Sequence, residues 1–286
     1  MSTTVTRELP RETPVTGPAP HREPKKRWTR LILPVYSGLV MFYLVLPILV
    51  MIVFSFNNSG FKKVSFRWLG FTTKWYAPSA LTAQPGLSNA VKNSLIVAVI
   101  STLIATVLGT LMALALVRYR FRGKGTTDFV LFMNISAPEI VLGASLLSLF
   151  ITFGVPRGLM TIIIAHVMFN IAYVAVTVRA RLIGFDLALE EAAQDLGANA
   201  WTTFRRVTLP IIFPGVIAGA LLAFALSIDD FVITNFNAGA TQTFPLWVYG
   251  VVKVGIPPQV FVIGTLIFMG GIALAISTVV LQRRKA

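Results

Sequence analysis

Six long apolar runs alternate with short polar segments along this chain. At a rise of about 1.5 Å per residue, a helix formed by any of these runs is long enough to cross a hydrocarbon core about 30 Å thick. The first run follows basic residues, as in a signal peptide, but it is too long and lacks a small-residue cleavage site. We therefore predict six transmembrane helices, at residues 31–56, 89–117, 127–153, 158–183, 211–236 and 259–281.

The composition agrees with this pattern. Hydrophobic residues make up 55% of the chain, charged residues 13%, and the mean hydropathy is +0.76, which is typical of an integral membrane protein without a sizeable soluble domain. A net charge of +14 would suggest a nucleic-acid partner for a soluble protein. Here the basic residues flank the apolar runs, where anionic lipid headgroups are their partner. We expect contact with a lipid bilayer and none with nucleic acid.

The distribution of Lys and Arg predicts the orientation. Segments that alternate on one side hold about 18 of the 25 Lys and Arg residues, the excess expected of cytosolic segments. Both termini and the polar loop at residues 184–210 are therefore expected in the cytosol, and the aromatic segment 57–88 on the outer side. Residues 1–30 are expected to form a disordered basic tail, because they hold few large apolar side chains, and residues 31–286 a single membrane domain.

Several kinds of chemistry are improbable for this chain. It has no Cys and two His, which argues against a disulfide and against a metal site. It has no Gly-x-x-x-x-Gly-Lys-Ser/Thr loop, so we expect it neither to bind nor to hydrolyse ATP. A metal-dependent enzyme built on Asp229 and Asp230 is improbable, because two adjacent acids without further ligands do not make a site. We predict no enzymatic activity and no bound cofactor, and expect any energy source to be a separate chain.

The polar loop at residues 184–210 reads as two short helices. Asp186 is a candidate N-cap, and Glu190 and Glu191 lie early in the first helix, where the helix dipole favours anions. Gly197 is expected to end that helix. The second helix is expected to end at Leu209-Pro210.

This loop resembles the EAA loop of ABC-importer permeases. The shared pattern is Glu191-Ala192-Ala193, three residues, Gly197, nine residues, then Val207-Thr208-Leu209-Pro210, with Val where Ile is commoner. The resemblance implies that the loop docks on a cytosolic ATPase and transmits its closure, whereas the residues alone also fit an ordinary amphipathic loop between two membrane helices. The coupling residues that it implies are Glu190, Glu191, Ala192, Ala193, Gly197, Arg205, Leu209 and Pro210.

Ionisable residues inside predicted spans are costly and are therefore candidate functional residues. Glu139 falls near the middle of the third helix, next to Pro138, which should kink that helix and free a carbonyl. This pattern fits part of a cation path, although a protonated or paired structural Glu139 remains possible. In the fourth helix His166, Asn170 and Tyr173 begin a polar stripe that Thr177 continues, expected to face a cavity or a neighbouring helix. For His166 we favour an interhelical hydrogen bond over substrate contact.

The fifth predicted helix carries two adjacent acids near its outer end. On a continuous helix Asp230 shares a polar stripe with Thr234, so Asp230 is the better candidate for a ligand facing the transport path and Asp229 for a buried pair. Both acids could instead lie at headgroup level. Trp247 and neighbouring Phe residues could add cation–π contacts to an amine. Small residues four apart, Gly215-x-x-x-Gly219-x-x-x-Ala223, predict a close helix-packing face.

Within the permease family, the chain resembles the second permease subunit of spermidine/putrescine importers. The resemblance rests on Pro138–Val141, Ser227–Ile233, Pro245-Leu246 and Val252–Gly255. It implies an all-α membrane protein of type I ABC-importer permease architecture in the bacterial plasma (inner) membrane. It also implies a second homologous permease subunit, two cytosolic ATPase subunits that hold ATP and Mg, and an extracytoplasmic substrate-binding protein.

The substrate implied is a polyamine moving inward. The candidate path residues are Glu139, Asp229, Asp230, His166, Asn170, Tyr173, Thr234 and Trp247. The chain departs from the family in its N-terminal tail and in the cations of the outer segment, namely Lys62, Lys63, Arg67 and Lys74, which fit a cationic substrate poorly. A permease for another small solute, such as an amino compound or ferric iron, remains an alternative. A proton-coupled transporter is a further one, although inverted-repeat halves are not evident.

Overall fold

The computed structural model describes residues 29–60 and 67–283, and this part of the chain is helical apart from one isolated bridge between Asn57 and Phe71. Most of the predicted tail, Lys62, Lys63 and the last three residues lie outside the described residues. The long helices are α1 (Thr29–Ser55), α3 (Leu87–Arg118), α4 (Lys124–Ser136), α5 (Glu139–Thr152), α6 (Leu159–Leu182), α9 (Leu209–Asp229) and α12 (Gln259–Arg283). The shorter ones are η1 (Lys74–Tyr76), α2 (Pro78–Thr82), α7 (Ala188–Asp195), α8 (Ala200–Thr203), η2 (Phe204–Thr208), α10 (Val232–Asn237) and α11 (Phe244–Val252).

Five helical segments of the described chain are long and apolar enough to cross a membrane, at Ile32–Ser55, Leu87–Arg118, Leu159–Leu182, Ala200–Asp229 and Gln259–Thr278. They correspond to five of the six predicted runs. The first of them lies in α1, whose part up to Leu49 belongs to one unit of the structure and whose part from Val50 belongs to another. The side chains of the first part are largely exposed, as Leu39 and Phe42 are, which fits a helix that faces lipid.

The sixth predicted helix is broken. Instead of one kinked helix at residues 127–153, α4 and α5 meet at an angle of 111°. Pro138 supplies no backbone N–H, and a residue that precedes proline is disfavoured in the helical region. Ala137 accordingly adopts an extended conformation, with φ −70° and ψ 138°. If α4 and α5 together are counted as one broken span, the described chain has up to six helical segments that could cross a membrane.

The fifth predicted helix also differs at both ends. It continues from Ala200 through a π-helical stretch, η2, into α9, so Leu209-Pro210 does not end a helix as predicted. A wider π turn relieves the clash between a proline ring and the carbonyl of the preceding turn, which explains why Pro210 is accommodated. At the other end the helix stops at Asp229 rather than at residue 236, and α10 begins after Asp230 and Phe231.

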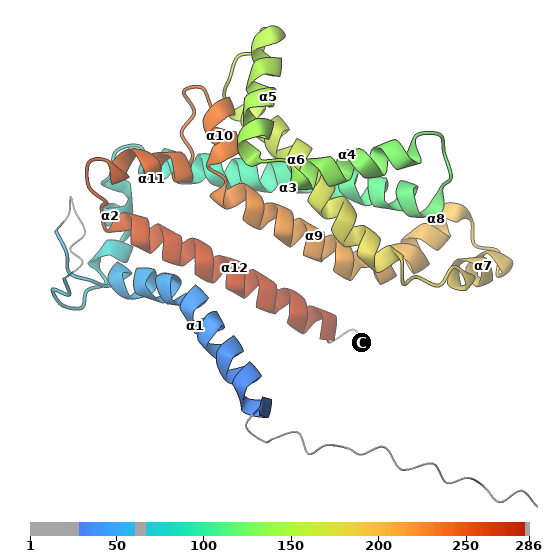
Figure 1. Ribbon diagram of the computed structural model, residues 1–286, viewed down its shortest axis with the longest axis horizontal. Coiled ribbons are helices and arrows are strands. Elements are labelled where there is room, and N and C mark those ends of the chain that lie inside the picture. The colour runs from blue at the N-terminus through green and yellow to red at the C-terminus, as the bar shows by residue number, and fades with distance from the viewer. Residues whose placement is uncertain (1–28, 61–66, 284–286) are drawn as a thin grey trace, which may run out of the picture. The chain divides into compact units, whose positions relative to one another are not determined.

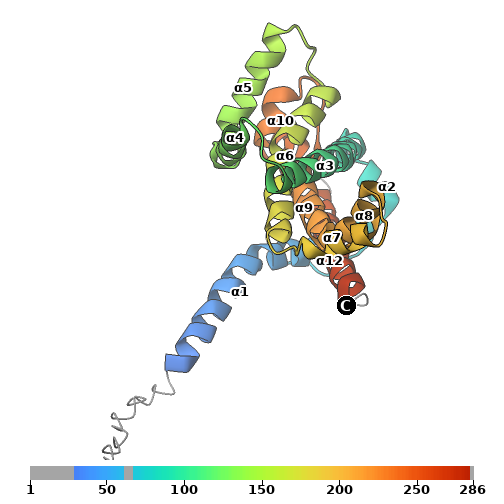
Figure 2. The same ribbon diagram turned by 90° about the vertical axis from the view of Figure 1, so that its right-hand side faces the viewer.

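Three helices, α3, α6 and α9, lie side by side in both views of the molecule (Figure 1 and Figure 2). Small residues allow this close packing. A Cβ added to Gly109 of α3 would lie 2.7 Å from the Cβ of Val174 in α6, and one added to Gly219 of α9 would lie 3.3 Å from Cγ1 of the same valine. Gly215 likewise faces Arg181 of α6. The predicted small-residue packing face on α9 is therefore confirmed.

The segment between α1 and α3 folds around Asn57. Its side-chain amide donates to the Arg67 carbonyl at 3.0 Å and accepts from the Leu69 N–H at 2.8 Å. The Trp75 indole donates to the Asn57 carbonyl at 3.0 Å and is 4% exposed. Trp75 is thus a core residue of this segment.

Candidate functional site

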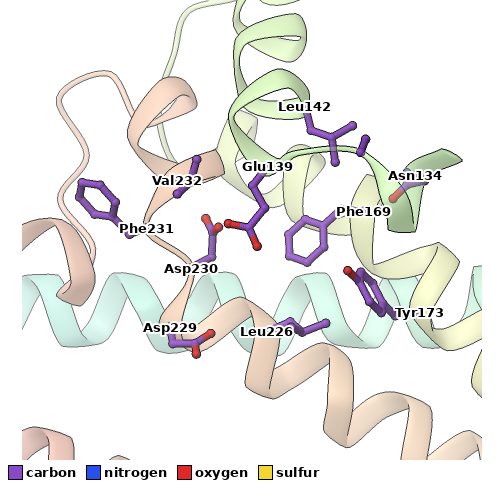
Figure 3. A pocket seen from close by; sticks show the side chains of 11 residues that line it. Asn134, Glu139, Leu142, Phe169, Tyr173, Leu226, Asp229, Asp230, Phe231 and Val232 are labelled. Carbon is purple, nitrogen blue, oxygen red and sulfur yellow. The ribbon is translucent and has the colours of Figure 1, made fainter.

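A cavity of about 290 Å³ forms where the break between α4 and α5 meets α6 and the break between α9 and α10 (Figure 3). Helix breaks place backbone ends and polar side chains inside an otherwise apolar bundle, as in transporter sites built from discontinuous helices. The cavity is lined by Asn134, Ala137, Glu139, Leu142, Phe169, Tyr173, Leu226, Asp229, Asp230, Phe231 and Val232.

Three carboxylates reach this cavity, and among the described residues that line it none is Lys or Arg. Glu139 is the first residue of α5 and is exposed. Asp229 is the last residue of α9 and is also exposed. In Figure 3 the carboxylates of Glu139 and Asp230 point toward the same space, and that of Asp229 lies on the α9 side of it. The lining therefore concentrates negative charge.

Asp230 is occupied by protein contacts. Its Oδ2 accepts hydrogen bonds from the Thr234 backbone N–H at 2.8 Å and from the Thr234 hydroxyl at 2.7 Å, and its Oδ1 accepts from the Ile233 N–H at 3.3 Å. The His166 Nε2 atom lies 3.3 Å from Oδ2, and the Asp230 side chain is 6% exposed. The sequence favoured Asp229 for a buried pair, and this expectation is wrong, because Asp230 is the paired residue; that Asp230 faces the transport path as a ligand stays a prediction. The expectation for Asp229 assumed a continuous helix, whereas the Asp230 side chain caps a new one.

The polar stripe of α6 is divided between a buried network and the cavity. His166 is 1% exposed, and its Nε2 lies 2.9 Å from the Thr234 hydroxyl, so the predicted interhelical hydrogen bond is confirmed. Asn170 donates to the Ser227 hydroxyl at 2.8 Å, and Ser227 bonds Ser101 of α3 at 3.0 Å. Tyr173 lines the cavity. Of the predicted path residues on this stripe, only Tyr173 therefore reaches the cavity.

The tautomer of His166 follows from its partners. The carboxylate of Asp230 can only accept, and the Thr234 hydroxyl already donates its proton to that carboxylate. Nε2 must therefore carry a proton to bond either of them. The other ring nitrogen, Nδ1, is buried and has no hydrogen-bond partner within residues 29–60 and 67–283, and the same holds for Oδ1 of Asn170 one turn further along α6.

Trp247 lies away from the cavity. Its indole donates to the Pro85 carbonyl at 3.0 Å, and its side chain packs with Leu87 and Phe244 in a buried cluster, 4% exposed. The aromatic residues that do line the cavity are Phe169, Tyr173 and Phe231. Sequence reasoning missed Phe169, because nothing distinguishes a cavity-lining Phe from a core one. It also missed Asn134, a polar residue five positions before Glu139 that its place in a span could have indicated.

A second, mainly apolar cavity of about 450 Å³ adjoins the first. Asp229 and Phe231 line both cavities, so they form the wall between them. The remaining lining residues come from α9, α11 and α12, namely Ile228, Phe244, Pro245, Val248, Tyr249, Val252, Gly264 and Ile267. Asp229 is therefore the carboxylate that meets both spaces.

The polar loop forms the two short helices that the sequence predicts, α7 and α8, at the end of the bundle where α3 ends (Figure 1). The Asp186 carboxylate accepts from the Ala188 N–H at 3.0 Å at the start of α7. Gly197 has φ +87° and ends this helix with two backbone hydrogen bonds, from its own N–H to Gln194 and from Ala198 to Ala193. The predicted stop is confirmed, whereas the N-cap position is Leu187, so Asp186 binds the start of the helix from one residue before the predicted cap.

The two adjacent glutamates of α7 face different surroundings. Glu191 is exposed, whereas the Glu190 side chain is 13% exposed. Glu190 Oε1 contacts both the Arg118 guanidinium and the Thr208 hydroxyl. The same loop also presents large apolar side chains, with Leu196 90% and Trp201 67% exposed. Arg205 is exposed on the same loop.

Comparisons with known proteins agree on one family. Residues 105–286 match the family described as "Binding-protein-dependent transport system inner membrane component". The chain is 40% identical over 257 residues to the spermidine/putrescine transport system permease protein PotC of Escherichia coli (strain K12), covering 90% of this chain and 96% of that protein. It is 40% identical over 233 residues to the putrescine transport system permease protein PotI of the same strain, covering 79% of this chain and 81% of that protein.

Solved structures share the fold at low identity. A chain of a bacterial ABC transporter involved in the import of the acidic polysaccharide alginate aligns with a TM-score of 0.63 at 18% identity, over 93% of this chain and 99% of that chain. A chain of the MetNI methionine ABC transporter in an inward facing conformation aligns with a TM-score of 0.56 at 16% identity, over 72% of this chain and 96% of that chain. At these identities the likeness concerns the fold alone.

Proposed function

The chain belongs to the family of binding-protein-dependent transport system inner membrane components, and we propose that it is the permease subunit of an ATP-driven importer that carries spermidine and putrescine inward. The names of the two relatives at 40% identity support this substrate class. The observation that carries the proposal is the cavity itself, which gathers three carboxylates and no Lys or Arg at two helix breaks. Such a lining favours an organic cation over an anion.

Helix ends distinguish the three carboxylates. Glu139 begins α5, and Asp230 caps α10, so each lies at a helix N-terminus, whose partial positive charge offsets some of its own. Asp229 ends α9, where the free carbonyls carry partial negative charge. The potential for a cation is therefore most favourable beside Asp229. We propose Asp229 as the principal ammonium ligand and Glu139 as the second.

Aromatic side chains fit the same substrate. Phe169, Tyr173 and Phe231 line the carboxylate cavity, where aromatic rings can attract an ammonium group by cation–π interaction. The volume of about 290 Å³ lies at the lower end for small-molecule sites, which suits a slender chain held transiently. Weak, divided contacts allow release, as transport requires. Asp230, His166, Asn170 and Thr234 then support the lining rather than bind substrate.

The proposed assembly has two permease subunits, two cytosolic ATPase subunits that hold ATP and Mg, and an extracytoplasmic substrate-binding protein. We propose that both termini and the α7–α8 loop face the cytosol. The exposed surface formed by Glu191, Leu196 and Trp201 is the proposed docking surface for an ATPase subunit. Closure of the ATPases on ATP would move this loop and open the carboxylate cavity to the outer side.

The decisive experiment is uptake by the reconstituted complex. The chain, its partner permease and the ATPase subunits are placed in liposomes, with the binding protein outside and ATP inside, and radiolabelled spermidine and putrescine are followed. We expect uptake that requires ATP and persists without a proton gradient. Unlabelled lysine and ferric citrate should not compete at concentrations where unlabelled putrescine does. Uptake driven by a proton gradient alone would reject an ABC importer, and competition by lysine or iron would reject the substrate.

A further inference from the structure

We propose that Glu190 and Arg118 form an internal clamp that transmits the movement of α7 to α3 and α9 of the same chain. The adjacent Glu191 would face the ATPase, and Glu190 would pass the movement inward. This inference rests on the proposed coupling role of the loop. The inference concerns a contact within the chain. The sequence pattern of the loop does not include Arg118, because Arg118 lies about seventy residues before Glu190.

Three segments meet at one carboxylate oxygen. Arg118 is the last residue of α3, Glu190 lies in the first turn of α7, and Thr208 is the last residue of η2, directly before α9. The guanidinium and the Thr208 hydroxyl both donate to Glu190 Oε1. The same guanidinium nitrogen lies 3.3 Å from the Thr208 hydroxyl, which therefore accepts from Arg118 while donating to Glu190. The three groups form a closed triangle.

The surroundings make this clamp stiff. Thr208 is fully buried, and the Glu190 and Arg118 side chains are 13% and 22% exposed. Charge-assisted hydrogen bonds that are shielded from water are stronger than those on a surface. By contrast, the Arg179–Asp128 pair, with N–O distance 2.5 Å between α6 and α4, is about one-third exposed and is expected to be weaker.

Arg118 also holds the start of the loop. Its guanidinium lies 5.9 Å from the centre of the Phe185 ring, within the range of cation–π attraction. One side chain thus contacts the loop at its beginning (Phe185), in its first helix (Glu190) and at its end (Thr208). A displacement of α7 would pull on the ends of α3 and α9 together.

The consequence for transport lies at the other end of α9. That helix runs from the clamp to Asp229 at the carboxylate cavity, and α3 packs closely against α6, as Gly109 does against Val174. Because α-helices are stiff along their axes, a pull at Thr208 is carried toward the cavity. Loss of the clamp should let the ATPases complete their cycle while the cavity responds less often.

The test measures the solute imported per ATP hydrolysed in the reconstituted complex. We expect Glu190→Gln and Arg118→Gln each to lower this ratio by about tenfold, the effect of losing one charge-assisted hydrogen bond. The double variant should be no worse than the poorer single variant, and Arg118→Glu combined with Glu190→Arg should recover part of the loss. Asp128→Asn is the matched control, because it removes another ion pair at the same end of the bundle, and it should leave the ratio unchanged. Unchanged ratios in the single variants, or losses that multiply in the double variant, would overturn the clamp.

A second measurement does not depend on the substrate. Because the chain has no Cys, spin labels can be placed at Gln194→Cys in α7 and Arg120→Cys after α3, both exposed positions. We expect Glu190→Gln to broaden the distance distribution between the labels in the assembled complex and Asp128→Asn to leave it unchanged. An unchanged distribution in Glu190→Gln contradicts the clamp. A wild-type complex that imports no polyamine contradicts the proposed function instead, and the label experiment still tests the clamp.

Discussion

His166 Nε2 lies 3.3 Å from Asp230 Oδ2, and this pair fastens α6 to the break between α9 and α10. Both side chains are nearly inaccessible, at 1% and 6% exposed. Asp230 also caps α10 through Thr234, so one carboxylate fixes the position of the break and the start of the next helix. Because Asp229 directly precedes Asp230, the His166–Asp230 pair also fixes the backbone position from which the Asp229 carboxylate reaches the cavity.

Removing either member of this pair should destabilise the fold. Loss of one partner leaves the other buried without its charge-assisted contact, and breaking a buried pair typically costs about 3–5 kcal/mol. We expect His166→Ala and Asp230→Ala each to lower the free energy of unfolding by about that order, as measured by SDS titration in mixed micelles. The double variant should lose less than the sum, because no orphaned partner remains. A strictly additive cycle would show that the two residues act independently. Asp230→Asn, which can still accept from the Thr234 N–H, should be milder than Asp230→Ala.

The carboxylates of the cavity should affect transport rather than stability. We expect Asp229→Asn to reduce the initial rate of spermidine uptake by about tenfold, because one ammonium–carboxylate contact contributes about 1–3 kcal/mol. Glu139→Gln should reduce it less, because the N-terminus of α5 already offsets part of its charge. Both should leave the unfolding free energy nearly unchanged, since both side chains are exposed. The control is Asp128→Asn, a carboxylate outside the cavity. Full activity of Asp229→Asn would remove it from the substrate path.

The sequence predicted the positions of the long membrane spans better than the positions and angles of the helix breaks. A long apolar run needs no tertiary information, so five spans are found where hydropathy places them. Pro138 indicated a bend, but its size of 111° depends on how α5 packs on α10, where Gly143 lies under the ring of Phe236. The break at Asp230 was missed, because apolar periodicity continues past it. The Asp230 carboxylate accepts hydrogen bonds from backbone N–H groups that would otherwise continue the helix, and the spacing of apolar residues does not reveal such a competing bond.

The candidate residues divide in the same way. Sequence spacing identified the α7 loop and its Gly197 stop, since both are local features. It could not distinguish Glu190 from Glu191, because the packing of α7 against α3 decides which of them meets Arg118. Arg118 entered the sequence argument only as one of many cytosolic charges. Its role depends on residues brought together from distant parts of the chain.

Gly197 should be sensitive to backbone conformation and insensitive to side-chain size. Its φ is +87°, and nothing lies within 4 Å of an added Cβ, so a substitution introduces strain without a clash. We expect Gly197→Ala to cost about 1–2 kcal/mol locally and Gly197→Asn less, because Asn adopts the left-handed region more readily. The measurement is the fraction of ATPase subunit that copurifies with the permease. Gly184→Ala, in the same loop, with open space and no positive φ, is the matched control and should copurify as the wild type does. Equal losses in both alanine variants would exclude a conformational cause.

The same Gly→Ala substitution should change the stability of the protein differently at three helix positions. At Gly271 of α12 nothing lies within 4 Å, so alanine should stabilise the helix by about 0.5–1 kcal/mol through its better propensity. At Gly264 the added Cβ would lie 2.8 Å from the sulfur of Met51, a flexible side chain that can move, so gain and loss should nearly cancel. At Gly109 it would lie 2.7 Å from the Cβ of Val174 and 3.0 Å from the backbone oxygen of Ile171, neither of which can move without separating α3 from α6.

We therefore expect Gly109→Ala to destabilise the protein by about 1–3 kcal/mol, the usual cost of an overpacked core. Thermal unfolding of the purified permease, followed by tryptophan fluorescence in one detergent, should rank the variants Gly271→Ala, Gly264→Ala and Gly109→Ala from most to least stable. The order tests whether α3 and α6 are held at backbone contact. If Gly109→Ala unfolds at the same temperature as Gly271→Ala, the two helices are further apart than the close packing described above. The clamp at Arg118 would then have no rigid helix pair through which to act.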